Sequence, residues 1–242
     1  MRIAGFVKNS VIDYPEKLAA VVFTPGCNLD CYYCHNRFIL QPETWGDFLP
    51  EEDVFRFLEK RRKLLDGVVI TGGEPTLQKD LKGFIQKVKN LGYSIKLDTN
   101  GTNPELLKDL IDDRLLDYVA MDLKAPLAKY SHICGIKSPE VLEKIKESIK
   151  LLLAGQVTYE FRTTFVPELT QEDIEEMLEY IQGARLFVLQ QYRLPELPNS
   201  ELTKNKELAK RIKKLSAHSA KYIQETAQKA AEKVKHCEIR GI

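Results

Sequence analysis

The fold is decided by the stretch Leu18-Ala-Ala-Val-Val-Phe-Thr-Pro-Gly-Cys27, which runs directly into Asn-Leu-Asp-Cys31-Tyr-Tyr-Cys34. Its first residues are apolar and partly β-branched, which is typical of a short buried strand. Pro25 and Gly26 end that strand, and three cysteines then follow within eight residues. A buried strand therefore delivers a group of thiols to the loop beyond its carboxyl end.

Composition limits what kind of protein this is. The chain has 242 residues, 43% of them hydrophobic, with 36 Lys+Arg against 35 Asp+Glu. So many apolar residues can bury a sizeable core, which excludes a disordered chain. A net charge of +1 argues against broad nucleic-acid binding. No apolar run is long enough for a membrane span or a signal peptide, so we predict a cytoplasmic protein with reduced thiols.

Short apolar runs alternate with longer segments of helical period along the chain. The predicted strands are Leu18–Phe23, Val68–Ile70, Ser94–Leu97, Tyr118–Met121, Thr158–Phe165 and Phe187–Gln191. Residues typical of helix starts precede the segments between them, namely Pro50, Thr76, Asn103, Ser138 and Thr170. Apolar residues at helical spacing continue from about Glu201 to Lys235, where we predict one long helix.

This alternation predicts an α/β fold with a parallel sheet and right-handed crossovers. Six strand–helix units are fewer than a closed barrel needs, so we predict an open, partial parallel (β/α)6 barrel. A doubly wound open sheet is the alternative, although no Gly-x-Gly-x-x-Gly follows the first strand. We expect a single domain over residues 1–242, with the barrel at about 18–200 and the C-terminal helix at about 201–235.

Polar residues follow the predicted strands. The groups are Thr71-Gly-Gly-Glu-Pro75, Asp98-Thr-Asn-Gly101 and Asp122-Leu-Lys124, and the last two strands bring Arg162, Gln190 and Gln191. Ligands bind beyond the carboxyl ends of the strands in both candidate folds. We therefore predict a functional rim, although Asp and Asn also favour such positions simply because they cap turns and helices.

The cysteine spacing C-x3-C-x2-C suits a soft metal or an iron–sulfur cluster. Three thiolates would leave one corner of a four-iron cluster open to a substrate. Zinc with His35 as a fourth ligand is an alternative, but Cys34 and His35 are adjacent, which is awkward around one tetrahedral ion. A buried group of free thiols is the remaining structural interpretation.

With Tyr33 before its last cysteine, this motif resembles the signature of radical S-adenosylmethionine enzymes, and Thr71-Gly-Gly-Glu-Pro75 strengthens the resemblance. Within that superfamily, three features are similar to the activating enzymes of glycyl radical proteins: Cys34-His35-Asn36, Asp98-Thr-Asn-Gly101 and the segment from Ser10 to Pro15. The resemblance implies that the protein is an oxidoreductase. It would cleave S-adenosylmethionine reductively and use the 5′-deoxyadenosyl radical to take a hydrogen atom from a glycine of a partner enzyme, with anaerobic ribonucleoside-triphosphate reductase as the first candidate.

The resemblance also implies roles for individual residues. Cys27, Cys31 and Cys34 would hold one 4Fe–4S cluster, which is the catalytic centre. The residues expected to bind S-adenosylmethionine are Tyr33, Gly72, Gly73, Glu74, Asp98, Asn100, Asp122, Lys124 and Arg162. Asp98, Thr99, Met121 and Asp122 would bind a monovalent cation. A flavodoxin- or ferredoxin-type protein would supply the electron.

Other parts of the sequence carry less information. Cys134 and Cys237 are isolated, and we interpret both as ordinary free thiols. The Lys- and Arg-rich C-terminal segment is either the solvated face of a helix or an interaction surface. Two alternative functions stay open at this point: a radical enzyme that modifies a small molecule or an RNA base, as in deazapurine synthesis, and a zinc-binding adaptor without catalysis.

Overall fold

The computed structural model describes residues 1–40, 47–136, 138–195 and 206–242. Its strands are β1 (Gly5–Ser10), β2 (Ala19–Thr24), β3 (Gly67–Gly72), β4 (Ser94–Thr99), β5 (Tyr118–Asp122), β6 (Thr158–Phe165), β7 (Phe187–Gln191) and β8 (Cys237–Arg240). Its α-helices are α1 (Glu51–Arg61), α2 (Leu81–Asn90), α3 (Pro104–Asp112), α4 (Tyr130–Cys134), α5 (Pro139–Leu153), α6 (Gln171–Tyr180), α8 (Lys206–Lys213) and α9 (Ala220–Ala230). Short 3-10 turns lie at Arg37–Ile39, Pro75–Leu77 and Leu127–Lys129.

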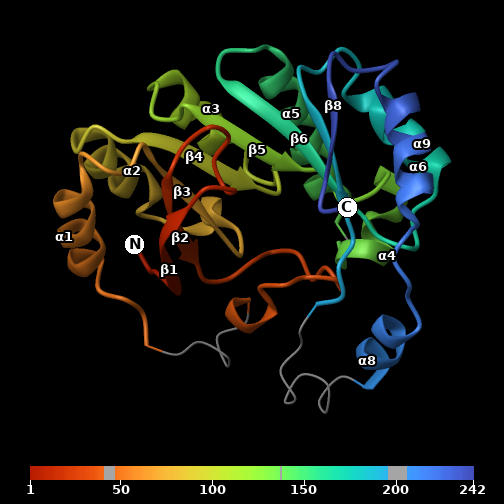
Figure 1. Cartoon of the computed structure of the whole chain (residues 1–242), viewed down its shortest axis with the longest axis horizontal. Coiled ribbons are helices and arrows are strands. Elements are labelled where there is room, and N and C mark those ends of the chain that lie inside the picture. The colour runs from red at the N-terminus through yellow and green to blue at the C-terminus, as the bar shows by residue number, and fades with distance from the viewer. Residues whose placement is uncertain (41–46, 137, 196–205) are drawn as a thin grey trace.

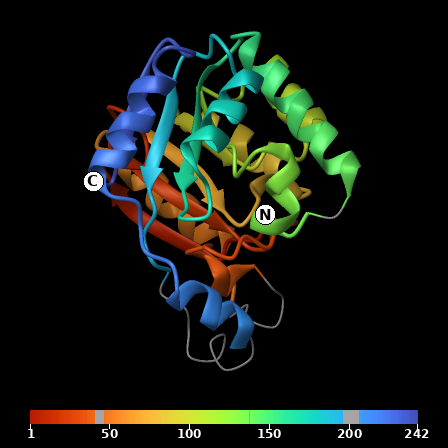
Figure 2. The same cartoon turned by 90° about the vertical axis from the view of Figure 1, so that its right-hand side faces the viewer.

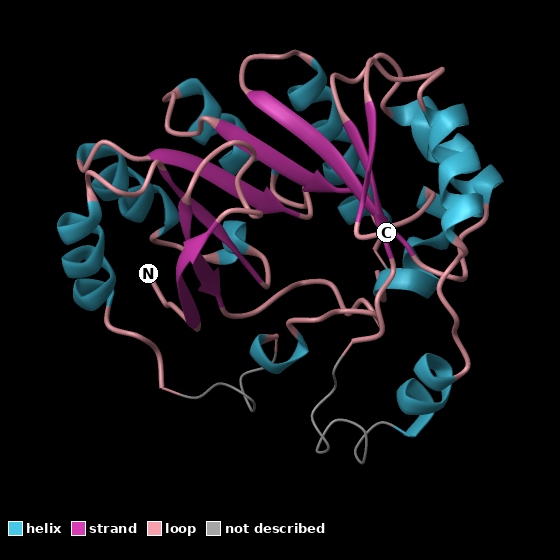
Figure 3. Ribbon diagram, viewed as in Figure 1, coloured by secondary structure: helices cyan, strands magenta, loops and turns pink. Residues whose placement is uncertain are grey.

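The strands form one sheet whose spatial order follows the chain from β1 to β8. β1 is antiparallel to β2, and every later pair is parallel. The sheet is curved and open, and the larger helices lie along its outer side (Figures 1 and 3). The predicted open parallel α/β architecture is therefore confirmed, and each of the six predicted strands is present.

Side chains alternate between the two faces of the sheet, as strand geometry requires. The outward side chains, such as Val22, Ile70 and Leu97, pack with the helices in the main hydrophobic core. A small apolar cluster that includes Ala19, Val21 and Tyr14 occupies the inner face instead. Among the described helices, the larger ones cover the outer face of the sheet, and the concave side is left for a site (Figure 1).

Two strands of the sheet were missed by the sequence analysis. β1 presents three exposed residues in a row, and β8 has only four residues. Neither shows the buried apolar run by which the inner strands were recognised, because each strand lies at an edge of the sheet. Within the described residues, the sheet thus has eight strands, because these two edge strands add to the six predicted ones.

The single long helix predicted from about Glu201 to Lys235 was also wrong. Residues 201–205 lie outside the described residues, and beyond them the chain forms α8 and α9 with a break between. Ser219 starts α9 by accepting a hydrogen bond from the Tyr222 amide. His218 lies within 3.2 Å of the Val166 carbonyl and 2.9 Å of the Leu169 carbonyl, and these contacts tie the break to the loop after β6.

Of the predicted helix starts, Asn103 and Thr170 make capping hydrogen bonds, and Thr170 forms a capping box with Asp173. Thr76 instead lies in the 3-10 turn ahead of α2, which begins at Leu81. Ser138 occupies the position before α5 without a side-chain cap. No described helix is both long and apolar enough to cross a membrane.

Candidate active site

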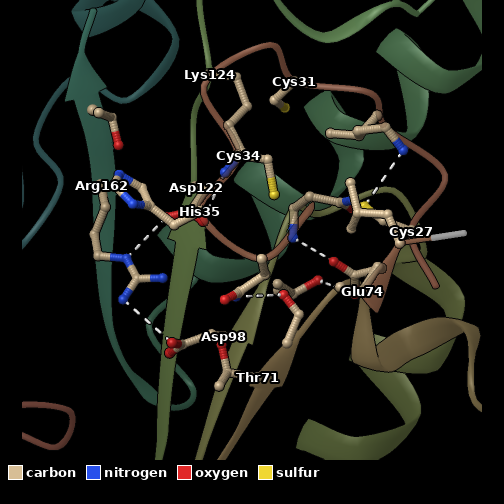
Figure 4. A pocket seen from close by; sticks show the side chains of 18 of the residues that line it. Cys27, Cys31, Cys34, His35, Thr71, Glu74, Asp98, Asp122, Lys124 and Arg162 are labelled. Atoms are coloured by element: carbon tan, nitrogen blue, oxygen red, sulfur yellow. Dashed lines mark hydrogen bonds and ion pairs between the residues drawn. The ribbon is translucent and has the colours of Figure 1, made fainter. Parts of the chain in front are cut away.

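A pocket of about 440 Å³ lies at the carboxyl ends of the parallel strands. Almost every predicted site residue lines it: Cys27, Cys31, Tyr33, Cys34, Gly72, Gly73, Glu74, Asp98, Thr99, Asn100, Asp122, Lys124 and Arg162. Figure 4 shows the cysteines on one side and the Asp98–Arg162–Asp122 group on the other. The fold therefore brings together loops that are far apart in sequence. Of the residues predicted to bind the cluster, the cofactor or the cation, only Met121 stays outside the lining.

The cysteine loop is held by groups on both of its sides. The buried Arg37 donates to the Cys31 carbonyl at 3.1 Å and to the Asp30 carboxylate at 2.6 Å. Across the loop, the Asp30 amide donates to the Cys134 carbonyl of α4 at 2.9 Å. These bonds fix the main chain around Cys31 before any metal is bound.

The three thiols share the pocket without converging on one point. Cys31 is buried, whereas Cys27 and Cys34 are only partly buried. Within the described ranges, no three His, Cys, Asp or Glu side chains gather closely enough to hold a single metal ion. Thiolates are the ligands of iron–sulfur clusters, in which each one binds a different iron corner, so this spread-out arrangement fits such a cluster.

The thiols differ in their acid–base environment. Burial, followed by the Glu74 charge, raises the pKa of Cys27 to about 12. Burial likewise raises the pKa of Cys34. The neighbouring Cys134 thiol, by contrast, lowers the pKa of Cys31. Because a bound metal needs thiolates, cluster assembly has to release the protons of Cys27 and Cys34.

Gly72 and Gly73 allow two loops to touch. Gly72 has φ +120°, a conformation that side-chain-bearing residues rarely adopt. A Cβ on Gly73 would lie 1.9 Å from the Gly26 carbonyl oxygen. The amides of Gly73 and Glu74 donate to the carbonyls of Thr24 and Gly26, at 2.9 and 2.7 Å. The glycines thus bring the loop after β3 against the strand end that carries the cysteines.

Glu74 is a brace inside the protein. Its side chain is fully buried. One carboxylate oxygen accepts bonds from the Thr76 amide (3.0 Å), the Thr76 hydroxyl (2.5 Å) and the Thr99 hydroxyl (2.8 Å), and the other accepts from the Asn100 amide at 2.7 Å. Burial raises the pKa of the Glu74 carboxylate, although these hydrogen bonds act to lower it. Glu74 therefore joins the loops after β3 and β4, and its carboxylate is already fully used.

Asn100 links the same β4 loop to the cysteine loop. Its side-chain nitrogen Nδ2 donates to Asn28 Oδ1 at 3.0 Å and lies 3.7 Å from the Cys27 sulfur. Its side-chain oxygen Oδ1 accepts hydrogen bonds from the main-chain amide and the hydroxyl of Thr102, at 3.0 and 2.7 Å. Asn28 in turn donates to the Thr102 hydroxyl at 2.8 Å. The sequence analysis missed Asn28 as a partner in this link.

The charged side of the pocket is a chain of ion pairs. Arg162 Nε lies 2.9 Å from Asp122 Oδ1, and Arg162 Nη1 lies 3.4 Å from Asp98 Oδ2 (Figure 4). Lys124 Nζ binds Asp122 Oδ2 at 2.9 Å, and Lys96 binds Asp98 Oδ1. Burial opposes ionisation of both aspartates, but the charge of Arg162, together with that of the nearby lysines, outweighs it and holds each pKa below its ordinary value.

The remaining predicted residues lie apart from this chain of charges. Tyr33 is 95% covered, and its ring packs edge-on against Tyr32. The Thr99 hydroxyl donates to Glu74, and the fully buried Met121 packs against Gly101. Their roles toward a cofactor or a cation stay predictions.

The sequence analysis assigned no role in the site to three residues that the structure places there. Cys134 was interpreted as a bystander, yet its thiol is buried beside Cys31. Arg211 of α8 reaches the cysteine loop, with its guanidinium carbon 3.9 Å from the Tyr32 ring centre. Asp13, from the segment between β1 and β2, lines the pocket. Only the last was hinted at, because the segment from Ser10 to Pro15 was singled out for its resemblance.

A thiol-lined pocket at the mouth of an open parallel sheet, with a Gly-Gly loop and paired aspartates, defines a cofactor enzyme of the partial-barrel class. The Radical SAM superfamily matches residues 21–181, and the chain belongs to that superfamily. It is therefore an oxidoreductase-type enzyme, and the family implies one 4Fe–4S cluster and S-adenosylmethionine.

Two relatives and one solved structure show which proteins this chain is similar to. A Methanocaldococcus jannaschii protein, provisionally named a glycyl-radical enzyme activating enzyme, is 39% identical over 207 residues, which are 84% of each chain. A Pyrococcus horikoshii protein, provisionally named a GTP 3′,8-cyclase, is 34% identical over 54% of this chain and 42% of its own. Among solved structures, Streptococcus suis SuiB has a TM-score of 0.62 at 15% identity, over 91% of this chain and 48% of its own, and this shows a shared fold only.

Proposed function

We propose that this protein activates a glycyl radical enzyme by removing a hydrogen atom from one of that enzyme's glycines. The observation that carries the proposal is the relative from Methanocaldococcus jannaschii, which carries that name and is similar over 84% of both chains. This similarity extends over 207 of the 242 residues. The GTP cyclase relative matches only about half of this chain, which favours the activase.

Cys27, Cys31 and Cys34 would hold the cluster, because their thiols line one pocket on a loop that Arg37 and α4 already fix. When bound, the cluster would supply one-electron chemistry: an electron from the donor protein would pass through it to S-adenosylmethionine, whose sulfur–C5′ bond would break into methionine and an adenosyl radical able to take the hydrogen atom. The glycine loop at Gly72 and Gly73 leaves room for a backbone contact with the cofactor. Lys124 would offer its positive charge to a carboxylate of the cofactor. The carboxylate oxygens of Asp98 and Asp122 would accept further hydrogen bonds from an amino or hydroxyl group beside their present ion pairs.

A second cavity, of about 640 Å³, continues from the site along the concave face of the sheet. It shares a wall with the first cavity at Asp13, His35, Arg162, Thr164 and Gln190. Main-chain amides of an entering peptide need donors and acceptors, and the Thr164 hydroxyl and Gln190 amide provide both. This continuity supports a protein segment as the substrate.

The finer parts of the proposal are the partner and the electron donor. We rank anaerobic ribonucleoside-triphosphate reductase first, by family resemblance, and expect a flavodoxin- or ferredoxin-type donor in the cytoplasm. Asp98, Thr99, Met121 and Asp122 would bind a monovalent cation only if the present ion pairs rearranged. A radical enzyme that acts on a small molecule is the second candidate, supported by the shorter match to the GTP cyclase relative.

The test reconstitutes the full chain anaerobically with iron and sulfide, reduces it with S-adenosylmethionine, and adds a candidate glycyl radical enzyme. We expect about four irons per chain, formation of 5′-deoxyadenosine, and a glycyl radical signal on the partner in electron paramagnetic resonance. The Cys31→Ala variant should give none of the three. Deoxyadenosine without a glycyl radical on any candidate would transfer support to the small-molecule enzyme, and a colourless protein that binds only zinc would overturn both.

A further inference from the structure

The paired aspartates of the site already have a cation, and it belongs to the chain. We propose that the guanidinium of Arg162 takes the place of the monovalent cation that the family resemblance implies for Asp98 and Asp122. The proposal rests on the proposed function only in taking this pocket as the S-adenosylmethionine site. Its consequence is that cofactor binding by this protein is independent of K⁺ and Na⁺.

Each of the four carboxylate oxygens of the two aspartates is engaged by a protein cation. Arg162 binds one oxygen of each aspartate, through Nη1 at 3.4 Å from Asp98 Oδ2 and through Nε at 2.9 Å from Asp122 Oδ1. The second oxygen of Asp98 is bound by Lys96, and that of Asp122 is bound by Lys124 at 2.9 Å. A hard cation needs several oxygen ligands around it. To bind one here, each of these oxygens would have to share its place with a side-chain cation or release it.

The net charge around the two aspartates also disfavours a bound cation. Counting Glu160 behind Arg162 and its partner Arg240, four cationic side chains face three carboxylates, so the group carries an excess positive charge before any ion arrives. The two aspartates and the three cations that pair with them are at least three-quarters covered from solvent, so this charge is poorly screened. A further cation would enter against that repulsion.

The other two predicted cation ligands do not face the aspartates. The Thr99 hydroxyl donates to Glu74 Oε1 at 2.8 Å and accepts from the Gly101 amide at 3.1 Å. The Met121 methyl group packs so closely against Gly101 that a Cβ there would lie 2.1 Å from it. Two of the four predicted ligands are thus committed to the turn after β4.

Arg162 is oriented by groups behind it on the concave face. Its Nη1 lies 3.9 Å from Oε1 of Glu160, which is fully buried. Glu160 is in turn held by the Tyr118 hydroxyl at 2.9 Å and by Arg240 of β8 at 3.0 and 2.8 Å. The planar guanidinium can bind both aspartates at once because its nitrogens diverge in a fixed plane.

The test compares KCl with tetramethylammonium chloride at equal ionic strength, since the larger ion cannot fill a dehydrated site. The first readout is the affinity of the reconstituted full chain for S-adenosylmethionine in equilibrium dialysis. The wild-type dissociation constant should change less than about twofold between the two salts, within the spread expected for general salt effects. The Arg162→Gln variant should bind S-adenosylmethionine more weakly than the wild type in tetramethylammonium chloride. In KCl its affinity should rise about tenfold or more, because K⁺ can occupy the position that the guanidinium has left between the two aspartates.

Two variants serve as controls. Arg162→Lys keeps a charge at the same position and should stay independent of K⁺. Arg240→Gln removes one charge from the same network but leaves both aspartates paired, and it should also be independent of K⁺. The second readout is the midpoint of thermal unfolding of the same proteins without cofactor, in which only Arg162→Gln should gain stability specifically from K⁺.

A saturable K⁺ dependence of the wild-type protein in either readout would overturn the proposal, even if Arg162→Gln failed to fold. A folded Arg162→Gln variant with no response to K⁺ would also overturn it. Neither result depends on a partner protein, so each leaves the proposed activase function standing. Loss of S-adenosylmethionine binding by the wild type in both salts would instead count against the proposed function.

Discussion

The guanidinium carbon of Arg211 lies 3.9 Å from the centre of the Tyr32 ring, between two of the cysteines that would hold the cluster. Arg211 also binds the Glu168 carboxylate at 2.6 Å and the His132 carbonyl at 3.2 Å. One side chain of α8 thereby connects the cysteine loop, α4 and the loop after β6. Figure 2 shows α8, in blue, at the lower end of the molecule, apart from the helices that cover the outer side of the sheet.

We therefore expect Arg211→Ala to weaken retention of the cluster. A cation–π contact of about 0.5–2 kcal/mol corresponds to a loss rate about 2- to 30-fold faster when a chelator competes for the iron. The decay of absorbance near 400 nm measures it. Lys229→Ala, which removes an exposed ion pair with Glu175, is the matched control and should leave the rate unchanged. Equal rates for Arg211→Ala and wild type would contradict the prediction.

The two cysteines outside the motif should be dispensable for holding iron. Cys134 is buried beside Cys31, and Cys237 lies on β8 away from the pocket lining. Iron content after anaerobic reconstitution should stay near the wild-type value in Cys134→Ala and Cys237→Ala, and should fall to background in Cys31→Ala. A Cys134→Ala protein without iron would mean that Cys134 is a ligand.

Glu74→Gln should destabilise the fold. The carboxylate accepts four hydrogen bonds, and an amide nitrogen in place of one oxygen would face donors that it cannot pair with. We expect a loss of about 1–3 kcal/mol in the free energy of unfolding, measured by urea denaturation. Glu147→Gln changes an exposed position on α5 and should be neutral. Equal stability of the two variants would show that Glu74 is not a brace.

Two glycine substitutions should have opposite effects. Gly73→Ala places a Cβ 1.9 Å from the Gly26 carbonyl oxygen and should cost about 2 kcal/mol or more, with loss of S-adenosylmethionine binding. Gly83→Ala meets no atom within 4 Å and lies inside α2, so it should stabilise the protein by about 0.5–1 kcal/mol. Denaturation curves of both variants check the signs, and a neutral Gly73→Ala would exclude the tight contact.

Cys237 should react slowly with iodoacetamide in the folded protein. Burial, and then the Glu238 charge, raises its pKa to about 11, so little reactive thiolate exists at about pH 8. Its alkylation rate should rise as the pH approaches that value and should increase when Glu238→Gln removes the neighbouring charge. Peptide mass spectrometry after timed alkylation measures the rate, and urea-unfolded protein sets the rate of a free thiol. A native rate equal to the unfolded one would contradict the pKa shift.

The inner strands were predictable because burial on both faces of a parallel sheet leaves an apolar run in the sequence. β8 was not, since Cys237–Arg240 has no such run and is a strand only through its pairing with β7. The break between α8 and α9 was hidden in a similar way. Leu215 and Tyr222 preserve the helical spacing across it, although Ser219 was a usable capping signal.

The sequence likewise predicted the site residues that stand in local motifs but not those that depend on contacts between distant segments. The cysteines, the Gly-Gly loop and the aspartates stand in short motifs at strand ends, so their meeting at one rim follows from the topology. Contacts such as Cys134 beside Cys31 depend on how distant segments pack, and no local pattern records that. The pairing of Arg162 with both aspartates is a similar case, because it depends on the register of β4, β5 and β6.

The order of the strands has a consequence for biosynthesis. Each strand pairs with its neighbour in the chain, so the sheet can grow strand by strand as the polypeptide emerges. The cysteine loop, however, is made early, while its supports on α4 and α8 come much later. Until the chain has been made through Lys213, the nascent cysteine loop thus has Arg37 beside it but lacks the contacts from α4 and α8. We therefore expect iron delivery after translation, when these contacts are in place.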